Sequence, residues 1–420
     1  MRAEVRYRLK LVLDSRFRHL ERERREEFVR FRQAFGFSLQ HRLAEARRNL
    51  PKALVVGSGF TGAVKVELGL IKGLELVGFE PVVLTWRDPW LVKYYELAGV
   101  ETIWYWEEFL QAVEESRAHR AVQGMRSSDE LIRFEWEGIR VGRFAASTAL
   151  RQLRVGSLNL TAPDICSQVT RRLAISLRHA RAAKAIVATI RPAVALFVDR
   201  GYTPQGELFD VCLGAGVDTL TWNGAHKSNS LMLKRYAAAN RDEHPASLSA
   251  ESWGWLCRMP WTAAHRQRLQ QEISRTYASG DWYSEVGTQF NTRVFASEEV
   301  QRALGLDPQK KTAVIFAHIL WDGTFFWGED LFSSYEEWLV ETVRTACANT
   351  SVNWIVKLHP ANRVKNARDG IAGESAEMRV LRLSIGALPP HVTVIPPESE
   401  MNNLSLFPVM EYALTVRGTI

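Results

Sequence analysis

The chain has 420 residues, of which 46% are hydrophobic and 24% are charged, and its formal net charge is +7. These proportions exclude a disordered, collagen-like or purely coiled-coil chain. The four cysteines are scattered, with no CxxC pair, so neither a disulfide framework nor a zinc site is expected. No apolar run approaches the roughly 18 residues that span a bilayer, and the N-terminus lacks the apolar core of a secretory signal. We therefore expect a cytoplasmic protein of two or three domains.

The first 50 residues are predicted to be a basic amphipathic helical segment. They hold thirteen Arg and Lys10 against seven acidic residues, so they account for the whole net charge. Leu and Phe recur at three- and four-residue steps, from Leu9 to Phe35, as on one face of a helix. Two interpretations stay open, namely a helix lying on an anionic membrane surface and a helix docked on its own domain or on a second subunit.

From Pro51 onward the sequence predicts alternating strands and helices. Such alternation indicates a parallel sheet that is covered on both faces, and so an α/β domain over residues 51–305. The predicted strands are Lys52–Val56, Pro81–Thr85, Thr102–Tyr105, Ala193–Val198 and Asp218–Trp222, and the predicted helices are Gly62–Val77, Pro89–Ala98, Thr170–Ile190 and Glu207–Ala215.

The pattern restarts after Gly305, which predicts a second α/β domain over residues 306–420. The sequence stops at Ile420, four residues after its last expected strand, so we expect this domain to be incomplete. The predicted strands are Lys311–Ile319, Val352–Leu358, His391–Ile395 and Ala413–Val416, with a helix at Tyr335–Ala348.

A glycine-rich turn follows the first strand. Gly57, Ser58, Gly59, Thr61 and Gly62 satisfy GxGxxG, whose glycines permit close backbone approach and whose following helix N-terminus favours an anion. The acid that contacts a dinucleotide ribose is not where it is expected. Arg87 stands near that position, so an NADP site and a purely structural turn both remain alternatives.

Polar residues also follow the strand at 193–198. Arg200 and Tyr202 lie in such a loop, and α/β folds place their ligands at the carboxyl ends of parallel strands. A surface turn before a helix is the structural alternative.

The most specific motif is Lys357-Leu358-His359-Pro360, at the end of a predicted strand. Lys357 and His359 share one side of the strand because side chains alternate, and Pro360 stops it. A cation and an imidazole together suit a phosphate or diphosphate leaving group.

Two further loops follow strands of the second domain. Asp322, in Trp321-Asp322-Gly323, is a candidate general base, although Asp-Gly is also an ordinary turn. Thr415, Arg417, Gly418 and Thr419 offer hydroxyl, guanidinium and backbone contacts for a phosphate. Because no DxD, GxxxxGK[ST], HExxH or GxSxG motif occurs, we expect no metal at the site.

Two stretches resemble bacterial capsule polysaccharide biosynthesis proteins of the GT-B glycosyltransferase type, and more distantly Kdo-transferring, sialyltransferase-like and teichoic-acid polymerase enzymes. They are residues 200–206 with 222–227, and Phe316 through Asn362, which contains Trp-Asp-Gly and the His-Pro motif.

The resemblance implies two facing Rossmann-like domains, the first binding an acceptor and the second a nucleotide-activated sugar. It implies donor-phosphate contacts at Lys357, His359, Pro360, Thr415, Arg417, Gly418 and Thr419, catalytic roles for Asp322 and His359, and acceptor contacts at Gly57, Ser58, Gly59, Thr61, Arg200 and Tyr202.

The expected function is therefore transfer of a sugar from a nucleotide donor to a capsular glycan or glycolipid acceptor. No cofactor is expected, because the nucleotide sugar is a substrate, and no nucleic-acid partner is expected. A membrane surface or a capsule-assembly complex would be the partner of residues 1–50, which would place the enzyme at the inner membrane face. An NADP-dependent oxidoreductase, a non-catalytic scaffold and a GT-B-type nucleotide-sugar epimerase are the alternatives.

Overall fold

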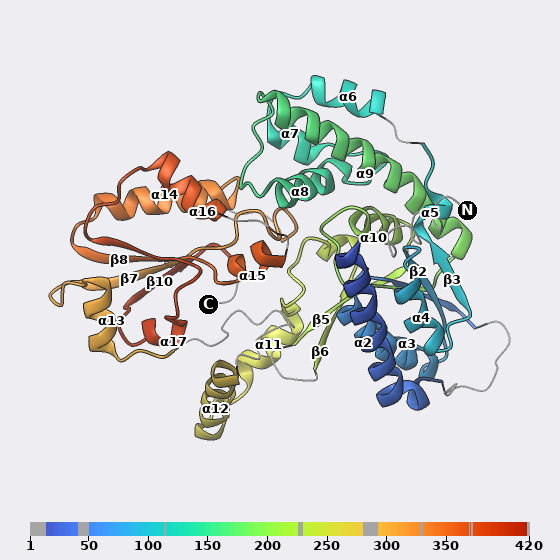
Figure 1. The fold of residues 1–420 in the computed structure, drawn as a ribbon, viewed down its shortest axis with the longest axis horizontal. Helices are drawn as coiled ribbons and strands as arrows, with labels where there is room; N and C mark the ends of the chain where they lie inside the picture. The colour runs from blue at the N-terminus through green and yellow to red at the C-terminus, as the bar shows by residue number, and fades with distance from the viewer. Residues whose placement is uncertain are drawn as a thin grey trace.

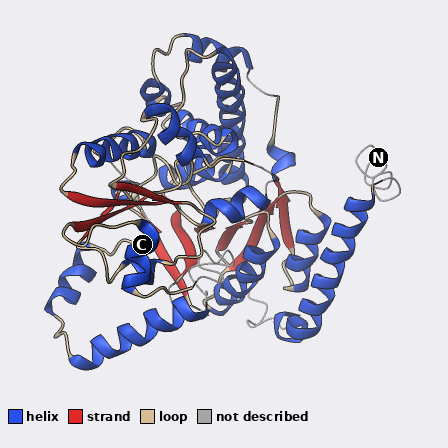
Figure 2. Ribbon diagram, turned by 60° about the vertical axis from the view of Figure 1, so that its left-hand side comes forward, coloured by secondary structure: helices blue, strands red, loops and turns tan. Residues whose placement is uncertain are grey.

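A computed structural model gives the fold of the chain. It describes residues 14–40, 50–112, 115–225, 230–279, 293–327, 331–368, 370 and 373–417. Two β-sheets lie on either side of a group of helices, as Figure 1 shows, and helices surround both sheets (Figure 2). The two parallel-sheet domains predicted from the sequence are confirmed.

The first sheet has six strands in the order β3-β2-β1-β4-β5-β6. All neighbouring strands are parallel except β6, which pairs antiparallel with β5. The interior strands are buried apolar runs, as expected for a sheet with both faces covered. The strands are β1 Lys52–Val56, β2 Glu80–Thr85, β3 Thr102–Tyr105, β4 Val194–Phe197, β5 Asp218–Gly224 and β6 Leu231–Tyr236.

Helices cover both faces of this sheet. Side chains of α3 (Thr61–Leu76) and α4 (Pro89–Leu97) form a core with one face, and those of α10 (Gln205–Gly214) form a core with the other. Asp88 fixes the start of α4, since its carboxylate accepts hydrogen bonds from the backbone N–H groups of Trp90 and Leu91. These helices agree closely with the predicted ranges.

A helical lobe between β3 and β4 was largely missed by the sequence analysis, which expected only a helix at residues 170–190. Buried side chains of this lobe share one core with the second sheet, so the lobe joins the two domains. It consists of α5 Trp106–Phe109, α6 Glu115–Gln123, α7 Ser128–Arg133, α8 Val141–Leu153 and the long α9 Pro163–Ile190.

The second sheet has four parallel strands in the order β10-β7-β8-β9. Helix α13 packs on it through Val300, so residues before the predicted boundary at 305 already belong to this core. The elements are α13 Ser297–Leu304, β7 Lys311–Phe316, α14 Tyr335–Ala348, β8 Val352–Lys357, α15 Ala361–Arg368, α16 Ala376–Ser384, β9 Val392–Ile395, α17 Asn403–Leu406 and β10 Tyr412–Thr415.

The N-terminal helix α2 (Ser15–Gln40) is docked against α4 (Figure 1). The Phe28 ring meets the Tyr94 ring edge-on at 5.0 Å, and Glu21 accepts a hydrogen bond from the Trp90 indole at 2.7 Å. Of the two interpretations of this segment, docking on the chain's own domain is what the structure shows for residues 15–40. Residues 1–13 and 41–49 lie outside the described residues.

Between the two domains the chain forms the short helix η1 (Ala238–Asn240) and then α11 (Ala250–Arg258) and α12 (Ala263–Ser279). Trp253, Trp255 and Trp261 are all more than half exposed there. Among the described residues, no helix combines the length and the apolarity that crossing a membrane requires.

Candidate functional site

Loops at the carboxyl ends of the two sheets meet in the middle of the molecule. Tyr202, in the loop after β4, donates a hydrogen bond from its hydroxyl to Asp322 Oδ1 at 3.1 Å, and Asp322 lies in the loop after β7. The backbone N–H of Gly323 donates to the Tyr202 hydroxyl oxygen at 2.8 Å. The structure therefore brings together two residues that the sequence assigned to opposite sides of a cleft.

Asp322 is ionised and firmly paired. Burial would raise the pKa of this carboxyl group, but the ammonium of Lys365 and the guanidinium of Arg151 lower it to about 2. Lys365, on α15, donates to Asp322 Oδ2, and Arg151, on α8, lies over the Tyr202 ring at 4.6 Å. The carboxylate thus ties both domains and the helical lobe to one point.

Two histidines of the site are held neutral by burial. Burial lowers the pKa of His359 to about 3, and it also lowers the pKa of His318. The backbone N–H of Ala361 donates to Nδ1 of His359 at 3.1 Å, so the ring proton is on Nε2. Nδ1 of His318 lies 2.8 Å from the carbonyl oxygen of Ile319, which places that ring's proton on Nδ1 and leaves Nε2 as the acceptor.

Lys357 ends β8 at the same edge of the sheet, as predicted. Its side chain is only 4% exposed, and burial alone lowers the pKa of its ammonium to about 8. Among the described residues no anion offsets this burial, which costs folding free energy, so the position is suited to a negatively charged ligand.

The last predicted donor segment is described only in part. Arg417 donates from its guanidinium to the carbonyl oxygen of Trp327 at 2.5 Å, so it fastens the loop after β7 to the end of β10. Thr415 is exposed at the end of β10. Gly418 and Thr419 lie outside the described residues.

The glycine-rich turn is already occupied by a carboxylate of the protein itself. Glu67 accepts a hydrogen bond from the backbone N–H of Ser58 at 3.0 Å and another from the Tyr95 hydroxyl. A Cβ atom at Gly57 would lie 2.7 Å from that hydroxyl, which explains the glycine there. Burial raises the pKa of Glu67 to about 7. The acid beside the turn disfavours a bound phosphate, and the turn supports packing around Gly57.

Arg200, which was predicted to contact the acceptor, is buried and bonds backbone carbonyl groups of two loops. Its side chain is 3% exposed, and its guanidinium donates to the backbone carbonyl groups of Arg241, Glu243 and Phe326. These carbonyl groups belong to the loop after η1 and to the loop after β7. A strand-end arginine can serve a ligand or a loop equally well, and here the loops take its hydrogen bonds.

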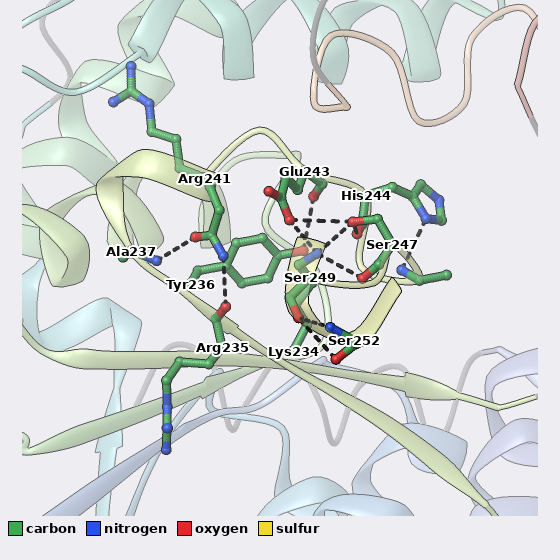
Figure 3. Close-up of polar contacts among 12 residues, drawn as sticks. Lys234, Arg235, Tyr236, Ala237, Arg241, Glu243, His244, Ser247, Ser249 and Ser252 are labelled. Carbon is green, nitrogen blue, oxygen red and sulfur yellow. Dashed lines mark hydrogen bonds and ion pairs between the residues drawn. The ribbon is translucent and has the colours of Figure 1, made fainter. Parts of the chain in front are cut away.

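Beside the turn lies a pocket of about 520 Å³. It opens at the carboxyl ends of β4 and β5, and Trp327 from the second domain completes its wall. The neighbouring loop is fastened to β6, since Lys234 Nζ donates to Glu243 at 2.7 Å and the Tyr236 hydroxyl donates to the Glu243 carbonyl at 3.1 Å (Figure 3). The His244 ring, held by this loop, lies 4.6 Å from the Trp327 ring.

Sequence reasoning missed several residues of the site, namely Arg151, His318, Lys365, His244 and Trp327. His318 carried a signal, because it follows β7 just as His359 follows β8. The other four reach the site through helix packing or long loops and have no local signal.

Comparison with known proteins leaves the family open. No protein-family model matches the sequence, and no curated protein is significantly similar to it. Among solved structures, the S. aureus MnaA–UDP complex is similar at a TM-score of 0.22 with 11% identity, covering 88% of this chain and 74% of that one. UDP-GlcNAc 2-epimerase from Neisseria meningitidis bound to UDP-GlcNAc is similar at a TM-score of 0.21 with 10% identity. That similarity covers 87% of this chain and 78% of the epimerase chain. Similarity at this level assigns no activity to the chain.

Proposed function

We propose that the chain is a glycosyltransferase of the GT-B type, which moves a sugar from a nucleotide-activated donor to an acceptor held between its two domains. The observation that carries this proposal is the meeting of two Rossmann-like sheet edges at Asp322 and Tyr202. Ligands of such sheets bind at the carboxyl ends of the strands. The resemblance of the motifs around Asp322 and His359 to capsule biosynthesis enzymes supports the same activity, and a capsular acceptor rests on that resemblance alone.

The donor phosphate would bind at the second sheet, against Lys357 and His359. The neutral His359 ring offers its Nε2–H as a hydrogen-bond donor, and the buried ammonium of Lys357 supplies the charge. As the bond to the sugar breaks, negative charge develops on the phosphate, and donors fixed in advance stabilise it. A bound phosphate would also raise the pKa of His359.

We assign the general base to His318 rather than to Asp322. A carboxylate with a pKa of about 2 is a weak proton acceptor at neutral pH. His318 is neutral, and its Nε2 can take the proton of the attacking hydroxyl while Nδ1–H stays bonded to Ile319. Asp322 would then position Tyr202 and Lys365.

The proposal is tested by nucleotide binding and donor turnover. Thermal unfolding of the full chain is followed with UDP, CMP, their sugar conjugates and NADPH, and nucleotide release is then measured with the stabilising donor. His359→Ala should lower turnover at least about a hundredfold with little change in the melting temperature. His391→Ala is the matched control, because its ring contacts Ala346 and lies apart from the site.

The outcomes separate the alternatives. Stabilisation by NADPH alone would favour an oxidoreductase, although Arg87 is already paired with Glu108. An absence of any nucleotide effect would favour a scaffold. A donor that is converted without transfer to any acceptor would favour an epimerase, and full turnover in His359→Ala would contradict the assigned site.

A further inference from the structure

The pocket beside the glycine-rich turn is lined by carbon rather than by polar groups. Among the described residues that line it, and apart from two indole N–H groups, only Asn223 and His244 have hydrogen-bonding side chains. The rest of the lining comes from Phe60, Gly62, Ala63, Val66, Val198, Trp222, Gly224, Leu231, Met232, Pro245, Ala246 and Trp327. A glycan chain presents a hydroxyl on most of its carbons, and such a wall leaves those hydroxyls without partners.

The described lining of the pocket also holds no cationic side chain. Among the described residues that line it, none is Lys or Arg, and in the adjacent turn the backbone N–H of Ser58 is taken by the carboxylate of Glu67. An anionic ligand group would therefore be desolvated beside an acid and without a cation.

The walls are formed in advance, and apolar groups remain in water at the mouth. Lys234 and Tyr236 hold the loop that carries His244 (Figure 3). Arg417 donates a hydrogen bond to the carbonyl of Trp327. The lining residues Phe60 and Leu231 are 54% and 41% exposed. A ligand that covers them would gain burial of apolar surface without reorganising the protein.

From this geometry we infer that the pocket binds an uncharged apolar group carried by the acceptor, such as the alkyl or aryl aglycone of a glycoside. The identification of this ligand as the acceptor rests on the proposed transferase function. The binding itself requires neither donor nor turnover.

The test is isothermal titration of the full chain with octyl β-glucoside below its micellar concentration, with methyl β-glucoside and with octyl phosphate. Octyl β-glucoside should bind with a dissociation constant at least about tenfold lower than methyl β-glucoside, since burying two methylene groups accounts for about that factor. Octyl phosphate should bind more weakly than octyl β-glucoside. Phe60→Ser and Leu231→Ser should each raise the dissociation constant for octyl β-glucoside several-fold.

Leu233→Ser is the matched control, because Leu233 lies on the same strand, is 56% exposed and does not line the pocket. The inference would be overturned by equal affinity for the two glucosides or by absence of octyl β-glucoside binding. It would also be overturned by a preference for octyl phosphate, or by equal effects of Leu231→Ser and Leu233→Ser. The thermal-unfolding measurement with nucleotides then shows which proposal has failed. If a nucleotide still stabilises the chain, only the proposed acceptor class is wrong. If no nucleotide stabilises it, the proposed transferase function is wrong as well.

Discussion

The carboxyl ends of the two sheets differ in how they treat a buried acid. At the second sheet, Lys365 and Arg151 lower the pKa of Asp322 to about 2, against the effect of burial. At the first sheet, no cation among the described residues offsets the burial of Glu67, which raises its pKa to about 7. Lys357 lies at the same edge as these two cations, whereas the described lining of the pocket at the first sheet's edge is mainly apolar. The edge of the second sheet is thus a cationic side of the molecule, and the pocket at the edge of the first sheet is an apolar side.

The largest expected effect concerns Lys357. Burial lowers the pKa of Lys357 from 10.5 to about 8, so below pH 8 the charged side chain lowers the unfolding free energy by up to about 3 kcal/mol. Lys357→Met should therefore stabilise the ligand-free chain by part of that amount. The same variant should lose the melting-temperature rise given by a nucleotide. Denaturant unfolding with and without nucleotide measures both effects.

Lys310→Met, at a partly exposed site before β7, is the control for removing a lysine. A Lys357→Met chain that is less stable than the wild type and still binds nucleotide would mean that the ammonium has a structural role.

The next effect concerns Glu67 and tests the apolar side. Its folded pKa of about 7 lies above the ordinary 4.5, so the folded chain holds this proton more tightly and loses stability as the pH rises from about 4.5 through 7. Glu67→Gln should therefore be more stable than the wild type by about 2 kcal/mol at pH 8, and the two should converge below pH 4.5. Urea unfolding across this range gives the curve, and a constant difference at all pH values would show that ionisation of Glu67 is not the cause.

Asp322 should behave in the opposite way. Its folded pKa of about 2 lies below the ordinary 3.8, so its contribution is complete above pH 4 and is lost as the pH falls toward 2. Asp322→Asn should lower the unfolding free energy by about 1–2 kcal/mol at pH 7, after allowance for the partial exposure of the Asp322–Lys365 ion pair. The loss should become smaller as the pH falls. Unfolding at pH 7 and pH 3 compares the two, and an equal cost at both would leave the ion pair with Lys365 without a measurable role.

The sequence predicted the strands well for a physical reason. Buried parallel strands are continuous apolar runs, and β1, β3 and the helix α14 fall at the predicted residues. Strand β6 was not predicted, because it is an antiparallel edge strand in which exposed residues alternate with half-buried ones. The helical lobe was missed because its helices are buried against two domains at once, which only the tertiary structure reveals.

The site was predictable only at strand ends. Lys357 is the last residue of β8 and His359 follows it, and the apolar run of this strand is clear in the sequence. Their place at the sheet edge could therefore be predicted. Lys365 and Arg151 reach Asp322 from helices, and no sequence pattern connects those three positions. Arg200 shows that a position after a strand does not identify the partner of a side chain. An arginine there has the same sequence pattern whether it binds a ligand or bonds backbone carbonyl groups, as Arg200 does in this structure.

The smallest expected effect tests the contact between the two sides. Tyr202→Phe removes the hydroxyl that donates to Asp322 and accepts from Gly323, and should cost about 1 kcal/mol of unfolding free energy. Combined with Asp322→Asn, it should cost less than the sum of the single variants, because both remove the same hydrogen bond. Tyr236→Phe, whose hydroxyl bonds Glu243 within the first domain, should be additive with Asp322→Asn. If Tyr202→Phe is additive as well, the hydrogen bond between the sheet edges does not couple them, and the two sides fold and bind independently.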